Sequence, residues 1–149
     1  MPSYLVFILM TIVSWGMYVP MVHATTGILK SSLRTYVLVC AAYFFTGVIT
    51  TGVMIAKGMS PLQWDAKGSP LGLFAGALGA IGALGIVLAV LNGGKPYVVA
   101  PLVFSGAPLV ATFVGMMMHP PKTAAEWPFY FGIVGVAICT GITMSYKPQ

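Results

Sequence analysis

Residues 71–91 read LGLFAGALGAIGALGIVLAVL, an unbroken apolar stretch that contains no charged side chain. About 20 such residues form a helix long enough to cross the roughly 30 Å hydrocarbon core of a bilayer, because each residue adds about 1.5 Å. The stretch therefore predicts a transmembrane helix. Its glycines predict how that helix packs: Gly72, Gly76 and Gly79 follow one another at intervals of four and three, which keeps them near one face. Small residues on one face let a second helix approach closely in lipid.

The composition of the whole chain extends this prediction outward. Of 149 residues, 6% are charged and 58% are hydrophobic, and the mean hydropathy is +0.96, whereas about a quarter of the residues in a soluble domain are charged. The nine charged residues separate long apolar runs: Lys30, Arg34, Lys57, Asp65, Lys67, Lys95, Lys122, Glu126 and Lys147. We expect a single all-α integral membrane domain of five transmembrane helices, at about 4–22, 35–56, 71–91, 98–118 and 127–146.

Several classes of function are disfavoured by what the sequence lacks. The basic residues are scattered singly over the predicted loops, so we expect no nucleic-acid partner. Cys40 and Cys139 lie in apolar runs without a C-x-x-C or Cys/His spacing, so we expect no metal and no cofactor. His23 and His119 fall at predicted helix ends, and no arrangement of nucleophile, acid and base is evident. We therefore expect that the protein is not an enzyme.

Three prolines interrupt predicted membrane helices, namely Pro20, Pro101 and Pro108. Each proline removes a backbone hydrogen bond, and in lipid this is tolerated where protein or a water-filled cavity satisfies the freed groups. Pro101 and Pro108 are seven residues apart, about two helical turns, and so lie on nearly the same face. Ser105 and Thr112 are expected to satisfy the freed carbonyls in part. We expect the three prolines to let their helices flex.

The same regions supply candidate substrate-binding residues. Trp15 and Tyr18 lie beside Pro20, and we interpret them either as an interfacial aromatic belt or as the wall of a cavity. The full candidate set comprises Trp15, Tyr18, Tyr43, Asn92, Ser105 and Thr112. No predicted span contains a carboxylate, which is the usual device for coupling transport to protons. A neutral or zwitterionic small-molecule substrate is therefore favoured.

Two stretches near the fourth predicted helix carry a family resemblance. Residues 91–102 (LNGGKPYVVAPL) and 107–115 (APLVATFVG) resemble the third and fourth helices of an EamA-like repeat of the drug/metabolite transporter superfamily. Residues 127–136 resemble its closing helix, and residues 14–20 (SWGMYVP) are similar to its opening helix, particularly in the sugar-porter branches. The family often has Gly-Glu after its fourth helix. This chain has Met118-His119-Pro120 there, so no role passes to Glu126.

The resemblance implies half of a ten-helix transporter, with substrate held between the first, third and fourth helices of each half. Alternating spans would place three basic residues on the N-terminal side (Lys57, Lys67, Lys122) and four on the other (Lys30, Arg34, Lys95, Lys147). Such a small difference barely orients a chain. We expect a homodimer in the bilayer, which is antiparallel if both orientations occur, or a half-transporter paired with another chain.

The predicted function is transport of small neutral or zwitterionic metabolites by alternating access, in a dimer of five-helix halves. Inverted repeats around a central site are common in transporters, and an antiparallel pair would recreate them. We expect the protein in a bacterial cytoplasmic (inner) membrane. The competing interpretation is an accessory or structural membrane subunit of a larger complex, which explains the glycines equally well but does not account for two prolines within one helix.

Overall fold

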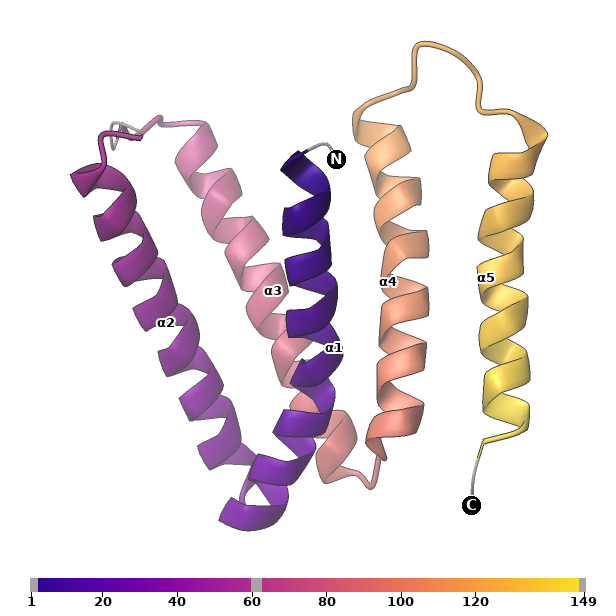
Figure 1. The fold of residues 1–149 in the computed structure, drawn as a ribbon, viewed down its shortest axis with the longest axis horizontal. Helices are drawn as coiled ribbons and strands as arrows, with labels where there is room; N and C mark the ends of the chain where they lie inside the picture. Colours follow the sequence, from indigo (N-terminus) through magenta and orange to yellow (C-terminus); the bar gives the residue numbers. More distant parts are fainter. Residues whose placement is uncertain (1–2, 60–62, 148–149) are drawn as a thin grey trace. The chain divides into compact units, whose positions relative to one another are not determined.

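The computed structural model describes residues 3–59 and 63–147. These residues form five helices and no strand: α1 (Ser3–Leu29), α2 (Ser32–Ala56), α3 (Gly68–Leu91), α4 (Pro96–Met118) and α5 (Trp127–Ser145) (Figure 1). Each helix is long and apolar enough to cross a membrane. The prediction of an all-α fold with five helices long and apolar enough to span a membrane is thereby confirmed.

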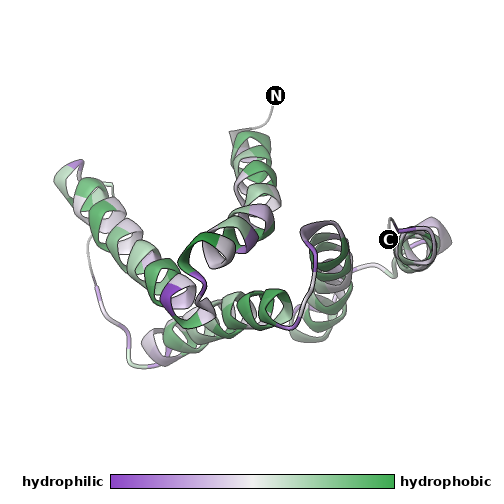
Figure 2. Ribbon diagram, turned by 90° about the horizontal axis from the view of Figure 1, so that it is seen from below, coloured by the Kyte–Doolittle hydropathy of each residue, from purple (hydrophilic) through white to green (hydrophobic). Residues whose placement is uncertain are grey.

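The charged residues lie at the ends of the helices or between them. Lys57 follows α2 directly, Lys67 and Lys95 precede α3 and α4, and Glu126 precedes α5. Arg34 is the one charged residue within a helix, and it occupies the first turn of α2. Figure 2 shows the result, with hydrophobic residues dominating the helices and hydrophilic residues gathered at the connections. No side-chain charge therefore has to be buried in hydrocarbon.

The helices extend slightly beyond the predicted spans. α1 continues to Leu29, seven residues past the predicted end at 22, and Pro20 lies within it. The apolar run ends near Val22, but His23 and the threonines after it are compatible with a helix that projects beyond the hydrocarbon. α3 begins three residues earlier than predicted, at Gly68. There the Asp65 carboxylate accepts hydrogen bonds from the backbone N–H groups of Lys67 (2.9 Å) and Gly68 (2.6 Å).

The chain divides into two compact units, which we describe separately. The first comprises Met1–Val19 and Gly94–Gln149, and the second comprises Pro20–Gly93. One boundary falls at Pro20 inside α1, and the other falls in the turn between α3 and α4. Gly93 in that turn has φ of +86°, a left-handed conformation that favours glycine. Both boundaries thus coincide with residues of unusual backbone character.

The second unit is built on the contacts of α2 with the end of α1 and with α3. Lys30 adopts a left-handed φ of 49° at the reversal between α1 and α2, and the Ser31 side chain then caps α2 by accepting from Arg34 N–H. The hydroxyl of Thr26 donates to that of Thr35 across the reversal (3.2 Å). Tyr36 donates from its hydroxyl to the Ala80 carbonyl of α3 (3.4 Å). The buried residues of α3 are concentrated in its second half: Ala83, Ile86, Val87 and Val90.

The first unit contains the first half of α1 together with α4 and α5. α4 and α5 contact each other and are joined by a connection over residues 119–126. Both helices begin with a proline in the first turn, where the missing N–H would have no helical partner. Within this unit the first half of α1 approaches α4, and the space between these two helices holds the candidate site.

Candidate functional site in a groove between α1 and α4

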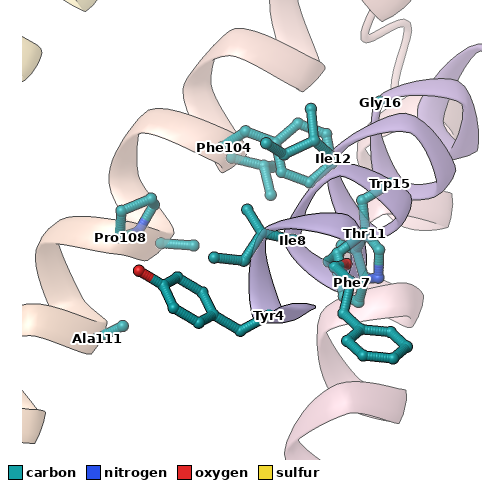
Figure 3. Close-up of a pocket in the computed structure, with 12 residues that line it drawn as sticks. Tyr4, Phe7, Ile8, Thr11, Ile12, Trp15, Gly16, Phe104, Pro108 and Ala111 are labelled. Carbon is teal, nitrogen blue, oxygen red and sulfur yellow. The ribbon is translucent and has the colours of Figure 1, made fainter. Parts of the chain in front are cut away.

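A groove of about 880 Å³ lies between the first half of α1 and the middle of α4, wholly within the first unit (Figure 3). Twelve residues line it: Tyr4, Phe7, Ile8, Thr11, Ile12, Trp15 and Gly16 from α1, and Val103, Phe104, Ala107, Pro108 and Ala111 from α4. Both helices are membrane-spanning by length and composition. The groove is therefore formed by two helices that are each long and apolar enough to span a membrane.

Helical periodicity explains why these residues meet in one groove. The α1 residues recur at intervals of three and four from Tyr4 to Gly16, which places them on one stripe of the helix. The α4 residues follow the same rule from Val103 to Ala111. Tyr4 extends its ring from α1 toward Pro108 and Ala111 of α4 (Figure 3). One face of each helix thus forms one wall.

Aromatic rings cross the groove near its Gly16 end. The rings of Trp15 and Phe104 lie with centroids 6.1 Å apart and planes at 75°, an edge-to-face arrangement. Tyr18 follows on α1, with its ring centroid 6.2 Å from that of Trp15 and the planes tilted by 40°. The Trp15–Phe104 contact joins α1 to α4 and supplies an aromatic surface on which a flat apolar ligand can stack.

The lining of the groove is mostly apolar and aromatic. None of the twelve lining residues is an Asp, Glu, Lys, Arg or His, so the groove offers no carboxylate, imidazole or amine for acid–base work. Thr11 donates its hydroxyl to the Phe7 carbonyl of its own helix (2.9 Å). Across residues 3–59 and 63–147, no group of three or more His, Cys, Asp or Glu side chains is placed to hold a metal ion. The arrangement can select a ligand by shape, aromatic stacking and a few hydrogen bonds.

Of the predicted binding residues in the first unit, only Trp15 is among the residues that line the groove. Tyr18 does not line it, but its ring lies beside the Trp15 ring. Ser105 and Thr112 lie on α4 but outside the set of lining residues. The Ser105 hydroxyl donates to the carbonyls of Pro101 (2.5 Å) and Leu102 (3.4 Å). The expectation that Ser105 satisfies a carbonyl freed by proline is therefore wrong, because those carbonyls belong to residues four positions before each proline.

Tyr43 and Asn92 belong to the second unit. Tyr43 is exposed on α2. Asn92 ends α3, where its side-chain amide donates to the Leu88 carbonyl (2.8 Å). The same carbonyl accepts the backbone N–H of Asn92 (3.0 Å), so two bonds to Leu88 hold Asn92 at the C-cap of α3. A substrate contact of either residue stays a prediction.

Pro108 lies in the wall of the groove, whereas Pro101 does not. Both lie inside α4, as Pro20 lies inside α1. Seven residues fall only about 20° short of two ideal turns, so the two α4 prolines lie on nearly the same face. They differ in position along the helix, because Pro101 precedes Val103, the first α4 residue that lines the groove.

Several lining residues were missed from the sequence, above all Tyr4, Ile8, Ile12 and Phe104. A signal was present: stepping back from Trp15 by three and then by fours reaches Ile12, Ile8 and Tyr4. Stepping back four residues from Pro108 reaches Phe104. What the sequence does not reveal is that these two stripes face each other.

Two of the three predicted packing glycines of α3 line a second groove. Gly72 and Gly76, together with Trp64 of the α2–α3 connection, border a space of about 690 Å³ in the second unit, whereas Gly79 does not. A β-carbon added at Gly72, Gly76 or Gly79 would meet nothing within 4 Å among the described residues outside the local helix backbone. Within one chain these glycines hold no close helix partner, and their packing role stays a prediction.

Comparison with known proteins found no matching family model, no matching curated protein and no matching solved structure. A relationship to EamA-like transporters therefore stays a prediction, which rests on the resemblance of residues 14–20, 91–102, 107–115 and 127–136.

Proposed function

We propose that this protein is a membrane transporter of small neutral or zwitterionic molecules, and that the groove between α1 and α4 holds the substrate. The observation that carries the proposal is the groove itself, an 880 Å³ space bordered by aromatic rings between two membrane-length helices. Small-molecule sites typically enclose about 300–1,000 Å³ and are lined mainly by apolar and aromatic side chains. The groove has the size and lining of such a site.

The absence of charge from the lining supports the choice of substrate. A charged group at the bilayer centre costs at least about 2.5 kcal/mol unless it is paired. The twelve lining residues contain no Asp or Glu to pair with a cation and no Lys or Arg to pair with an anion. A ligand without net charge is therefore favoured, and a proton-coupled exporter of cations is disfavoured.

A proline in the α4 wall and a second proline farther along α1 support a moving site. Pro108 lies in the groove wall on α4, and Pro20 marks a boundary between the two compact units on α1. A proline inside a helix removes one hydrogen bond of the ladder and permits a kink there. Alternating access needs helices that change shape around a substrate, and these two positions supply flexibility next to the groove.

The transporting form in this proposal is a homodimer of five-helix halves in the EamA-like manner, with the two copies antiparallel. The basic residues divide three against four between the two sides, so both orientations in a bacterial cytoplasmic membrane are accessible. Two oppositely inserted copies would reproduce the inverted repeat that surrounds the central site of many transporters.

Solute flux into liposomes that contain the purified protein tests the function. A panel of sugars, amino acids, nucleosides and aromatic alcohols should include at least one solute with saturable uptake above that of empty liposomes. A chain that transports none of them, and that purifies in fixed stoichiometry with an unrelated membrane protein, would be an accessory subunit.

A further inference from the structure

We propose that the groove selects neutral molecules that combine an apolar or aromatic body with a hydroxyl or N–H group, and that this donor bonds to backbone carbonyls released by proline. The inference names the substrate class of the groove and rests on the transport function proposed above. It depends on two observations: the identity of the carbonyls that lose their helical donors, and the place of their residues in the groove.

Pro108 releases a carbonyl in the α4 wall. In an α-helix the N–H of residue 108 would donate to the carbonyl of Phe104, but proline has no N–H and its ring crowds that carbonyl. Phe104 and Pro108 both line the groove. Both residues of the interrupted rung of the hydrogen-bond ladder therefore belong to the groove wall.

Pro20 releases a second carbonyl in the α1 wall. Its missing N–H would donate to the carbonyl of Gly16, which also lines the groove. Gly16 has no side chain to cover its backbone, and a β-carbon built there would meet nothing within 4 Å. The space beside the Gly16 α-carbon is therefore open to a ligand.

Two nearby hydroxyls, those of Ser105 and Thr11, do not replace the lost donors. The Ser105 hydroxyl donates to the carbonyls of Pro101 and Leu102, and the Thr11 hydroxyl donates to the carbonyl of Phe7. The Trp15 indole is a donor and has no acceptor atom. The two freed carbonyls therefore add acceptors to the hydroxyl oxygens of Tyr4 and Thr11, which also line the groove. An acceptor left unsatisfied in an apolar environment is costly, and a ligand that supplies a donor removes that cost.

Two features set the rest of the ligand. The Trp15 and Phe104 rings, with centroids 6.1 Å apart, favour a flat apolar or aromatic body. The lack of an Asp or Glu among the lining residues favours a neutral hydroxyl or N–H over an ammonium group. An aromatic alcohol satisfies both requirements.

Equilibrium binding of two probes to the protein in lipid nanodiscs tests the inference. 2-Naphthol carries a hydroxyl donor, and 2-methoxynaphthalene has the same rings without a donor. Binding to empty nanodiscs is subtracted to remove partition into lipid. We expect saturable binding of 2-naphthol with about tenfold higher affinity than its ether, the scale of a single hydrogen bond.

Restoring the helical N–H groups provides the matched variants. Pro108→Ala and Pro20→Ala return donors to the Phe104 and Gly16 carbonyls, so the preference for 2-naphthol should shrink severalfold in each and vanish in the double variant. Pro101→Ala is the control, because its N–H would reach Tyr97, which does not line the groove. The control should keep the preference of the unmodified chain.

Equal affinities for the two probes, no saturable binding, or a preference that survives in the double Pro→Ala variant would each overturn the inference. The readout is binding, so it separates this inference from the proposed function. Donor-selective binding without flux of any solute would refute transport alone, whereas flux that is indifferent to the donor would refute the donor selectivity alone.

Discussion

The ring of Trp15 on α1 meets the ring of Phe104 on α4 edge to face, with centroids 6.1 Å apart and planes at 75°. Both residues line the groove, so this contact joins its two walls. Edge-to-face pairs contribute about 0.5–1.5 kcal/mol beyond the apolar area that they bury.

We predict that Trp15 and Phe104 are energetically coupled. Trp15→Ala and Phe104→Ala should each lower the free energy of unfolding in detergent, and the double variant should lose about 0.5–1.5 kcal/mol less than the sum. Trp15→Ala combined with Phe131→Ala is the control, because Phe131 contacts Trp127 on α5. Its effects should add within about 0.5 kcal/mol. Additive effects for Trp15 and Phe104 would show that the contact carries no coupling.

Gly16→Ala should impair binding without harming the fold. The added methyl group has open space, so no clash is expected, and alanine favours a helix over glycine by about 1 kcal/mol. In the groove, however, the methyl group occupies the space beside the Gly16 carbonyl. We expect a melting temperature equal to or above that of the unmodified chain and a several-fold loss of affinity for 2-naphthol.

Gly47→Ala is the matched control for this prediction. Gly47 lies within α2, and its β-carbon position is also free of contacts within 4 Å. The same gain in helix propensity is expected, with unchanged affinity. If both glycine variants bind the probe equally well, the space beside Gly16 has no role in recognition.

Asp65 should stabilise the start of α3. Its carboxylate accepts from the N–H groups of Lys67 and Gly68, and losing a capping side chain typically costs about 0.5–2 kcal/mol. Thermal unfolding of Asp65→Ala in detergent should show a loss of this size. Glu126→Ala is a natural comparison, because Glu126 precedes α5 without a capping side-chain bond. Its effect should be smaller, and equal losses would contradict the capping role.

The near-even division of basic residues should make orientation easy to bias. Lys57→Gln with Lys67→Gln leaves one basic residue on the N-terminal side against four, which favours one orientation. A tag on either terminus should then react from only one face of the membrane. If the working form is antiparallel, this variant alone should lose flux.

Co-expression with a variant biased toward the opposite orientation provides a second, stricter test. Lys30→Gln, Arg34→Gln and Lys95→Gln leave one basic residue on the other side against three, so this variant should insert the opposite way. Together the two biased variants should restore flux. Full flux from either biased variant alone would rule out an antiparallel dimer.

The sequence sufficed for the fold class because bilayer crossing depends on length and apolarity, which residues 71–91 display directly. The sequence predicted the positions of the helix ends less accurately. Hydropathy falls after Val22, yet α1 runs to Leu29, because a helix need not end where the apolar run does. At Gly68 the helix begins early because the Asp65 carboxylate reaches two N–H groups, a detail of local geometry.

The candidate site was predictable only in part, for a physical reason. Trp15 and Pro108 stood out by residue type, and both line the groove. Ile8 and Ile12 resemble any lipid-facing residues, and only the approach of α4 makes them a wall. Ser105 was expected to repair a broken ladder, but its hydroxyl reaches the carbonyls of Pro101 and Leu102. The carbonyl that a serine bonds depends on how far its side chain reaches within one helical turn, and residue type alone does not reveal it.

The most direct test of the central claim is saturable solute uptake by liposomes containing the purified chain, compared between Trp15→Ala and Trp127→Ala. Trp127 contacts Phe131 on α5, with centroids 6.2 Å apart, and lies outside the groove, so its variant controls for the loss of an aromatic ring. We predict uptake that saturates, falls at least about tenfold in Trp15→Ala and is retained in Trp127→Ala. Uptake no greater than in empty liposomes, or equal uptake by both variants, would contradict the account.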